Sequence, residues 1–374
     1  RTYRMKMIAD MASVIQTGLR KGEDREAFKV MHNDKEETIN TAGHGYENAV
    51  DYLLHMLDKY NLTPADLIMV FEGRDSKKRR QQIAPTYKQD RDKSAPEYYR
   101  EYNRAKELIK AAFRSVGATA VTQDLAEGDD TCKYLTLVLD EPTVVVSNDG
   151  DLAVLAGITP KGHEVIWTNG ADENKFPDGV LMARHVTLYK AIVGDTKDSV
   201  KGVPGMGKVA WDKLFVTYGL DGLDEIATAL EDNDGNKIAR YAQQNNCKLL
   251  TKLVDNWNQA RLCWLQVKIY AEWVNNRYFP LKVEAGICID TANWPRLSYR
   301  GDLPAVPDSR LLPHMQKRRL VTATNYDECY KLLAARLAEE KDYPVAFDIE
   351  TSTPEDSDDW MAEQGKPDGV DTIG

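Results

Sequence analysis

Carboxylate side chains occur at five places in the first two hundred residues, each beyond an apolar run typical of a β-strand. In open parallel sheets, ligands bind beyond the carboxyl ends of the strands, so these side chains are expected to meet at one edge. Carboxylates gathered there would repel one another unless cations lay between them, and oxygen-only clusters suit Mg²⁺ or Mn²⁺. Two such ions can bind the attacking and the leaving oxygen of a phosphoryl displacement. The candidate ligands are Asp10, Glu72, Glu127, Asp129, Asp130, Asp149, Asp151, Asp195 and Asp198.

The ordinary alternative is that these acidic residues are solvated side chains in exposed loops. That interpretation suits any single pair. It does not explain why all five groups follow predicted strands, so the pattern favours a metal-dependent phosphoryl-transfer site.

Basic and aromatic residues are interleaved directly after Glu72. Arg79 and Arg80 come first, and Tyr87, Lys88 and Arg91 follow. A single nucleic-acid strand is bound by such a mixture, because cations pair with phosphates and aromatic rings stack on bases or sugars. A solvated charged face is the alternative, but the position beside the acidic site favours nucleic-acid binding.

A glycine-rich stretch precedes a predicted helix that contains Trp211. Glycines at such a place let backbone N–H groups approach a phosphate, which the helix N-terminus also favours. Phosphate contacts carry no base information, so the stretch predicts a clamp on duplex DNA of any sequence. An ordinary tight turn is the alternative. The candidate residues are Lys201, Gly202, Val203, Gly205, Gly207 and Lys208.

Bulk properties limit the class of protein. The chain has 374 residues, 42% of them hydrophobic, which allows two domains with a normal core. A net charge of −10 argues against a generally basic nucleic-acid coat. Five scattered cysteines without a CxxC pair fit a reducing cytoplasm rather than a disulfide framework or zinc site. No apolar run is long enough for a membrane span, and the ends at Arg1 and Gly374 suggest a piece of a longer protein.

Apolar β-rich runs alternate with helical patterns up to about residue 200, which predicts an α/β fold with a mostly parallel twisted sheet. Within this region, residues 97–116 predict a helix with one apolar stripe. Residues 201–284 predict a helical subdomain, and the prolines of 285–315 indicate a linker. A new unit over 316–374 is expected to contain a strand at 319–324, a helix at 327–340 and a strand at 345–349.

The last strand ends in a pair of carboxylates, Asp348 and Glu350. Alternate residues of a strand point to the same side, so these two could share a pair of metal ions.

Six segments occur in an order and at a spacing that resemble the flap-endonuclease-like 5′ nuclease family, which includes the 5′ nuclease domain of bacterial and phage DNA polymerase I. The resemblance extends from residue 5 to about residue 280. The segments are MIAD at 7–10, VFEG at 70–73, PTYKQDR at 85–91, AEGDD at 126–130, SNDGDL at 147–152 and GDTKDSVKGVPGMGK at 194–208.

The resemblance implies roles for the residues named above. The fold would be PIN/5′-nuclease-like, and all nine carboxylates would bind divalent ions. Lys88 and Arg91 would contact the scissile phosphate, with Arg80 at a further basic position. The glycine-rich stretch would be a helix-hairpin-helix-type duplex clamp that also holds a monovalent cation such as K⁺. Residues 86 to about 115 would form a helical arch that threads the single strand.

The chain also departs from the family pattern. Glu72 stands where the family usually has Asp, and Met11 follows Asp10 where a small residue is usual. Whether Glu72 is a ligand therefore stays open. The unit from 316 onward resembles the opening of a DEDD-type 3′–5′ exonuclease, with Asp348 and Glu350 in its first acidic motif. Its later motifs are absent, so we expect this unit to be partly ordered and without 3′–5′ activity.

Together these features predict a two-metal 5′–3′ exonuclease or flap endonuclease of DNA replication and repair. Its substrates would be 5′ ends, 5′ flaps, duplexes with a single-stranded arm, or RNA–DNA primers, without a membrane partner. It would act in the cytoplasm of a bacterial cell or a phage-infected host, joined to exonuclease and polymerase domains beyond Gly374. A catalytically weak junction-binding module is one alternative. A phosphatase acting on a small substrate is another, but it explains neither the basic segment nor the hairpin.

Overall fold

The structure is a computed structural model, and it describes residues 5–20, 27–32, 35–88, 95–286, 310–311, 321–322 and 372–373. The chain divides into two compact units, residues 1–315 and 316–374, which are considered separately. In the second unit, β10 (Val321–Thr322) pairs with β11 (Thr372–Ile373) in antiparallel fashion. β10 lies inside the first strand expected there. The expected helix, the second strand, Asp348 and Glu350 lie outside the described residues.

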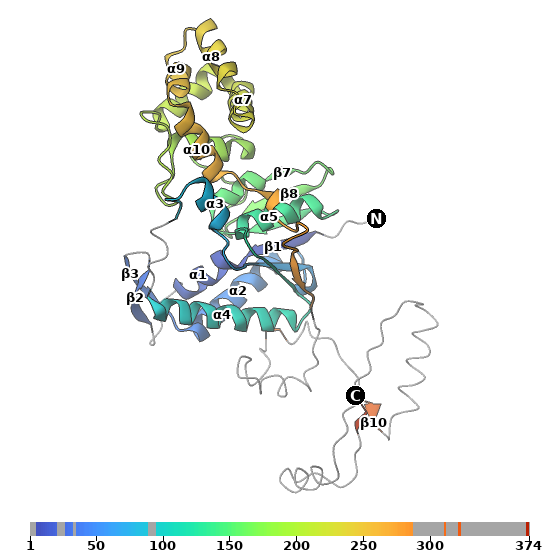
Figure 1. Cartoon of the computed structure of the whole chain (residues 1–374). Helices are drawn as coiled ribbons and strands as arrows, with labels where there is room; N and C mark the ends of the chain where they lie inside the picture. The colour runs from blue at the N-terminus through green and yellow to red at the C-terminus, as the bar shows by residue number, and fades with distance from the viewer. Residues whose placement is uncertain are drawn as a thin grey trace. The chain divides into compact units, whose positions relative to one another are not determined.

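A seven-stranded sheet forms the centre of the first unit, in the order β7-β8-β6-β1-β4-β5-β9 (Figure 1). Its five central strands are parallel, and the edge strands β7 and β9 are antiparallel to their neighbours. The predicted α/β class with a mostly parallel sheet is therefore confirmed. The strands are β1 Lys6–Asp10, β4 Leu67–Glu72, β5 Thr119–Gln123, β6 Thr143–Val146, β7 Gly157–Ile158, β8 Glu164–Thr168 and β9 Lys282–Glu284.

The strands β1, β4 and β6 at the centre of the sheet are largely apolar, as expected where helices cover both faces. Met7 and Ala9 of β1 belong to one core cluster, while Ile8 between them belongs to the other. The first face is covered by α1 (Met11–Arg20), α2 (Ala42–Lys59) and α4 (Pro96–Arg114). On the second face, α5 (Gly128–Val138) packs against β1 and β4, and α6 (Val186–Val193) and α10 (Trp257–Val267) pack against each other within the same core cluster.

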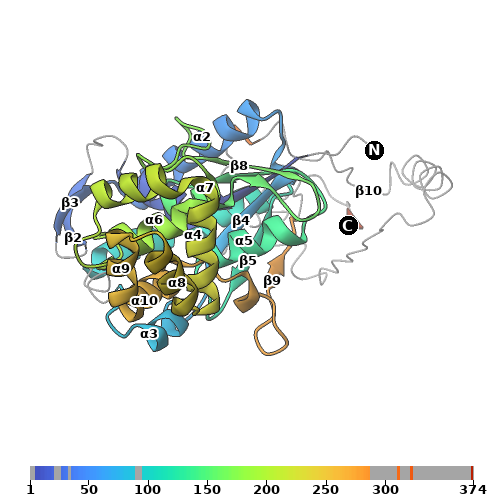
Figure 2. The ribbon, with the colours of Figure 1, turned by 90° about the horizontal axis from the view of Figure 1, so that it is seen from above.

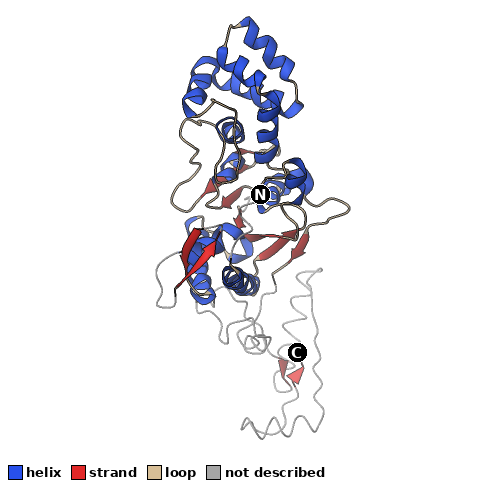
Figure 3. Cartoon of the chain, turned by 60° about the vertical axis from the view of Figure 1, so that its left-hand side comes forward, coloured by secondary structure: helices blue, strands red, loops and turns tan. Residues whose placement is uncertain are grey.

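Four α-helices follow the glycine-rich stretch in the described part of the chain, and the range 201–284 then ends in β9, which belongs to the sheet. In Figure 2, α7, α8, α9 and α10 lie together on one side of the sheet, and Figure 3 shows helices joined by loops in this part. α7 (Lys208–Asp232) bends at Gly219, whose φ of 64° is not helical. α8 (Gly235–Gln244) and α9 (Lys248–Asp255) pack against each other. Trp211 and Leu214 are fully buried and join α7 to the core on the second face.

The remaining elements are short. α3 (Lys78–Ile83) follows β4, and a two-stranded hairpin is formed by β2 (Phe28–His32) and β3 (Lys35–Ile39). The 3-10 helices are η1 Pro64–Asp66, η3 Gly150–Leu155, η4 Ala183–His185 and η5 Ala271–Trp273. Among the described residues, no helix has the length and apolar character to cross a membrane.

Part of the predicted arch over 86–115 is the helix α4, which packs against α1 and α2. Its apolar stripe, including Ala105, Ile109 and Phe113, is fully buried in the first core cluster. Asn103, Arg104 and Glu107 of the same helix are exposed. Residues 89–94 lie outside the described part, and the arch stays a prediction.

Candidate metal centre

Five of the nine predicted ligands come together in two groups that share one residue. The carboxylate oxygens of Asp129, Asp149 and Asp151 lie within 4.8 Å of one another, and this is the first group. Asp151, Asp195 and Asp198 meet the same criterion and form the second group. Closely spaced carboxylate oxygens are the donors that Mg²⁺ and Mn²⁺ prefer, so both groups fit a hard divalent cation.

The ends of local elements position these aspartates. Asp149 follows β6 and caps η3 by accepting a hydrogen bond of 3.2 Å from the backbone N–H of Asp151. Asp129 lies in the first turn of α5. Asp195 follows the helix α6, so the strand that the sequence predicted before it is wrong: the apolar run of residues 191–193 is helical. Asp195 exchanges two backbone hydrogen bonds with Val200, of 2.9 and 2.8 Å. A glycine must precede it, because Gly194 has a φ of 95° and a Cβ there would lie 2.9 Å from the Val200 carbonyl.

Like charges crowd the first group. Burial, together with the neighbouring Asp149 and Asp10, raises the pKa of Asp129 well above its ordinary value. Burial also raises the pKa of Asp10 to about 6, with further contributions from Asp149 and Glu72. Carboxylates in this situation gain strongly from a nearby cation, because it offsets both burial and mutual repulsion.

Asp10 and Glu72 lie near the two groups without belonging to them. Asp10 accepts a hydrogen bond of 2.7 Å from the Ser147 hydroxyl and one of 3.2 Å from the backbone N–H of Ala12. Glu72 accepts bonds from the N–H of Gly128 at 3.4 Å and from the Ser76 hydroxyl at 3.3 Å. Their assignment as ligands stays a prediction.

Glu127 is bound by side chains of the chain itself. It accepts hydrogen bonds from the Lys88 ammonium at 2.8 Å, from the Tyr87 hydroxyl at 3.0 Å and from the Arg80 guanidinium. Although burial opposes ionisation, Lys88 and Arg80 lower the pKa of Glu127 to about 2. Glu127 is therefore a fixed anion held by internal cations in this structure.

Asp130 anchors a separate network. Arg80 donates to it through both terminal nitrogens, at 2.9 and 2.7 Å, and the N–H of Tyr270 donates at 2.7 Å. Arg80 also donates to the carbonyl of Lys268 at 2.9 Å. Asp130 is completely buried, and Arg80 is 3% exposed. This arrangement ties α3, α5 and the segment after α10 together.

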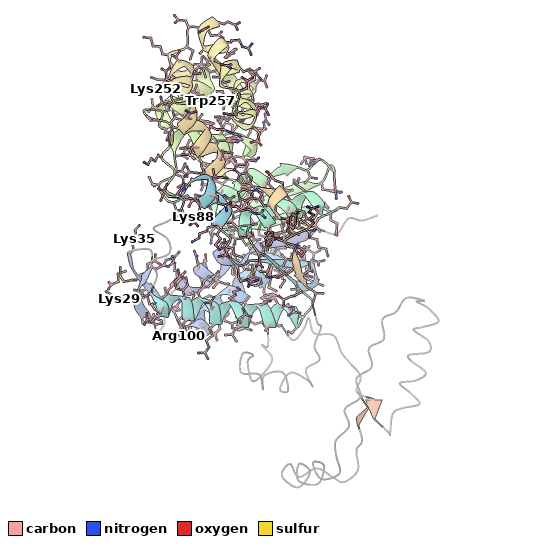
Figure 4. The ribbon with its side chains drawn as sticks, viewed as in Figure 1. Lys29, Lys35, Lys88, Arg100, Lys252 and Trp257 are labelled. Carbon is pink, nitrogen blue, oxygen red and sulfur yellow. The ribbon has the colours of Figure 1, made fainter. Side chains whose placement is uncertain are left out.

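The residues after Glu72 that were predicted to contact nucleic acid differ in how far they are buried. Arg80, Tyr87 and Lys88 are all buried, so the structure does not present them to solvent. Arg79 donates to the Trp273 carbonyl at 3.1 Å and lies against the Trp273 ring. Figure 4 shows Lys88 beside α3, between the sheet and the helices that follow α7. Arg91 lies outside the described residues.

The glycine-rich stretch forms a tight connection into α7. Gly202 and Gly205 adopt φ values of 70° and 67°, and Gly207 caps the helix. Val203 is buried rather than exposed, so its side chain belongs to the core. Lys208 is exposed and pairs with Asp178 at 3.1 Å. Lys201 is exposed as well.

The sequence analysis missed two lysines, one at the carboxylate groups and one at the glycine-rich stretch. The Lys190 ammonium contacts Asp151 and lies 2.8 Å from Asp195, inside the second group. Its sequence signal was a lysine one helical turn before Gly194. Lys252 of α9 donates to the Gly205 carbonyl at 3.2 Å, a contact between distant segments that had no sequence signal (Figure 4).

Comparison with known proteins agrees with the fold and the motifs. Residues 25–175 match the family described as 5′-3′ exonuclease, N-terminal resolvase-like domain. A DNA polymerase I of Bacillus caldotenax is 26% identical over 232 residues, 59% of this chain and 24% of that protein. A 5′-3′ exonuclease of Halalkalibacterium halodurans is 27% identical over 217 residues, 54% of this chain and 67% of its own.

The fold is also similar to that of the T5 5′-exonuclease, solved with zinc ions bound. The TM-score is 0.50 at 17% identity, covering 72% of this chain and 91% of that one. The matched part spans about a quarter of the polymerase relative. The resemblance noted from the six sequence segments is thereby confirmed: residues 25–175 match the model of the 5′-3′ exonuclease N-terminal resolvase-like domain, and the similar proteins include a 5′-3′ exonuclease and a DNA polymerase I.

Proposed function

We propose that this protein is a divalent-metal-dependent 5′ nuclease that hydrolyses phosphodiester bonds at 5′ ends or 5′ flaps. The observation that supports this most directly is the pair of carboxylate groups joined through Asp151. Two adjoining oxygen-rich sites suit the two-ion arrangement used for phosphoryl displacement. The match of residues 25–175 to the 5′-3′ exonuclease N-terminal domain independently supports the same chemistry.

Mg²⁺ or Mn²⁺ bound there would supply Lewis-acid activation of water and stabilisation of the negative charge that develops on the phosphate. The first group would be Asp129, Asp149 and Asp151, and the second Asp151, Asp195 and Asp198. Asp10, Glu72 and Glu127 would be the remaining carboxylates around the two metal ions. Asp130 would act by holding Arg80, not by direct ligation.

Lys88 would contact the scissile phosphate together with Arg91. The Lys88 ammonium lies 3.9 Å from Asp198 and 2.8 Å from Glu127, so it is already at the edge of the second group. A short movement away from Glu127 would let it neutralise charge on a phosphate. Arg80 would hold Glu127 and Asp130 in position through its hydrogen bonds to both carboxylates.

The exposed lysines at the start of α7 would bind the duplex part of the substrate. Lys201 and Lys208 stand on either side of the glycine-rich stretch, where backbone N–H groups can face a phosphate. A K⁺ ion at this hairpin is proposed from the family resemblance alone. Residues 1–200 would form the catalytic core, 201–284 the duplex-binding part, 285–315 a linker and 316–374 the start of a 3′–5′ exonuclease domain.

The substrates would be DNA with a 5′ end, a 5′ flap or a single-stranded arm, or an RNA–DNA primer. Because relatives include DNA polymerase I, we propose that polymerase domains follow Gly374 in the intact protein. Its setting would be the cytoplasm of a bacterial cell or phage-infected host, with a role in primer removal or repair.

The deciding experiment is turnover of a 5′-labelled flap duplex by the purified chain, with Mg²⁺ and with EDTA. We expect product only with Mg²⁺. A junction-binding module would instead retain the flap in a gel-shift assay under both conditions without cutting it. Hydrolysis of a small phosphomonoester, with the flap left intact, would favour a phosphatase.

A further inference from the structure

The Lys190 side chain occupies the space between two ligands of the second group. Its ammonium contacts Asp151 Oδ1 and lies 2.8 Å from Asp195 Oδ2. The three side chains are 15%, 12% and 14% exposed respectively, so water screens these charges only weakly. The positively charged ammonium of Lys190 therefore lies where the carboxylates of this group converge.

The helix that carries Lys190 holds it firmly in this place. α6 buries Leu188, Ala191 and Ile192 in the core and packs against α10 and η3, the element that contains Asp151. The helix ends at Gly194, directly before Asp195. Lysine and both carboxylates are thus attached to elements that are packed together, and the contact is a property of the fold.

The first group meets Lys190 through Asp151, the member that the two groups share. A lysine beside another of its members, Lys197, lies 3.8 Å from Asp149 with a side chain that is 64% exposed. An exposed ammonium at that distance is screened by water and can move away at little cost. The two groups therefore offer a divalent ion unequal conditions, although each contains three aspartates.

We propose that Lys190 is the resident cation of the second group, and that a second divalent ion binds only after displacing it. This inference rests on the proposed function, since it assumes that the carboxylate groups bind metal. A divalent ion and an ammonium a few ångströms apart repel each other strongly in a partly buried site. The first group consequently fills at lower metal concentration, and Lys190 sets the concentration at which the second group fills.

The test is a Mn²⁺ titration of the nucleic-acid-free protein, in which free Mn²⁺ is followed by its electron paramagnetic resonance signal. The wild type should bind one ion tightly and a second more weakly. Lys190→Met keeps the length of the side chain and removes its charge. We expect it to tighten the second ion by about tenfold or more while changing the first much less.

Lys197→Met is the matched control, because it also removes one positive charge beside an aspartate of the site. It should change both affinities by no more than about threefold. Lys190→Arg retains the positive charge, so the difference in affinity between the first and the second Mn²⁺ ion should remain. Circular dichroism and thermal unfolding establish that the variants are folded, and Lys190→Gln replaces Lys190→Met if the latter fails this check.

Equal second-ion affinity in the wild type and in the folded, uncharged variant would overturn the inference and leave the metal centre intact. Similar tightening in Lys197→Met would also overturn it, because general electrostatics would then suffice. Absence of Mn²⁺ binding in every variant would instead refute the metal centre and with it the proposed function.

Discussion

The ammonium of Lys88 donates a hydrogen bond of 2.8 Å to the carboxylate of Glu127, with 7% and 3% of the two residues exposed. Although burial disfavours a charged lysine, Glu127 holds the pKa of Lys88 well above its ordinary value. The side chain proposed to act on the phosphate is thus charged and held inward. A substrate phosphate would therefore have to compete with Glu127 for the Lys88 ammonium. The buried Lys88–Glu127 ion pair would have to open before Lys88 could take the position proposed for cleavage.

Asp151→Ala should reduce the single-turnover rate on a 5′ flap by about a hundredfold or more, because both carboxylate groups lose their shared member. Duplex binding in a gel-shift assay should change little, since the proposed clamp is elsewhere. Glu36→Ala, which removes an exposed carboxylate paired with Lys29 on the β2–β3 hairpin, serves as the control. Near-wild-type cutting by Asp151→Ala would refute the assignment.

Lys88→Ala should lower the single-turnover rate by about 10²–10³-fold, the effect of removing one preorganised contact to a developing anion. Flap affinity should fall much less. An equal loss in rate and affinity would make Lys88 an ordinary backbone contact. The variant should also be checked by denaturant unfolding, because Glu127 retains Arg80 and Tyr87 as partners and the fold should survive.

Arg80→Met should destabilise the protein by about 3–5 kcal/mol, because it leaves Asp130 buried without its ionic partner. Urea or guanidinium unfolding measures this loss directly. Arg79→Met changes the preceding residue and removes a partly exposed guanidinium. It should lower the free energy of unfolding by about 1 kcal/mol or less. If both variants unfold at the same denaturant concentration, Arg80 does not tie α3 to α5.

Lys208→Ala should weaken duplex binding almost equally for all sequences and reduce the salt slope of binding by about one unit. The side chain is exposed at the first residue of α7, so its removal should not disturb folding. Lys161→Ala removes another exposed lysine outside the proposed clamp and provides the comparison. Unchanged flap affinity at low salt would remove this hairpin from the DNA-binding surface.

Asp66 should make a stabilising contribution that depends on pH. Burial opposes its ionisation, but hydrogen bonds from Thr63 and the ion pair with Lys6 at 3.2 Å lower its pKa below the ordinary value. The folded-state pKa lies below the unfolded one, so this stabilisation is complete above the unfolded value and is lost as pH falls through the folded one. Asp66→Asn should therefore destabilise the protein at pH 7 by about 1–3 kcal/mol. Below the folded pKa it should cost far less. A pH-independent difference between the unfolding curves would contradict this account.

Local patterns were sufficient to predict the parallel sheet and four of the five strands that precede acidic residues. The fifth prediction was wrong, because the apolar run before Asp195 is the end of helix α6. Buried runs such as Met7–Ala9 and Val144–Val146 are apolar throughout because both faces are covered, and that property is visible in the chain itself. The same reasoning applied to α4, whose apolar stripe was apparent in the sequence. The structure buries that stripe, including Ala105 and Phe113, in the first core cluster.

Only the tertiary structure decided which charged side chains meet. Arg80 and Glu127 are 47 residues apart in the chain, and Lys190 is nearly forty residues from Asp151, so no local pattern records either contact. Residue types and spacing predicted that nine carboxylates approach one edge of the sheet. The structure brings five of them together in two carboxylate groups, while Lys88 holds Glu127 and Asp130 anchors Arg80. This division depends on the packing of α3, α5 and α6. A charged side chain pairs with whatever partner the fold brings within a few ångströms, and burial makes that choice strong.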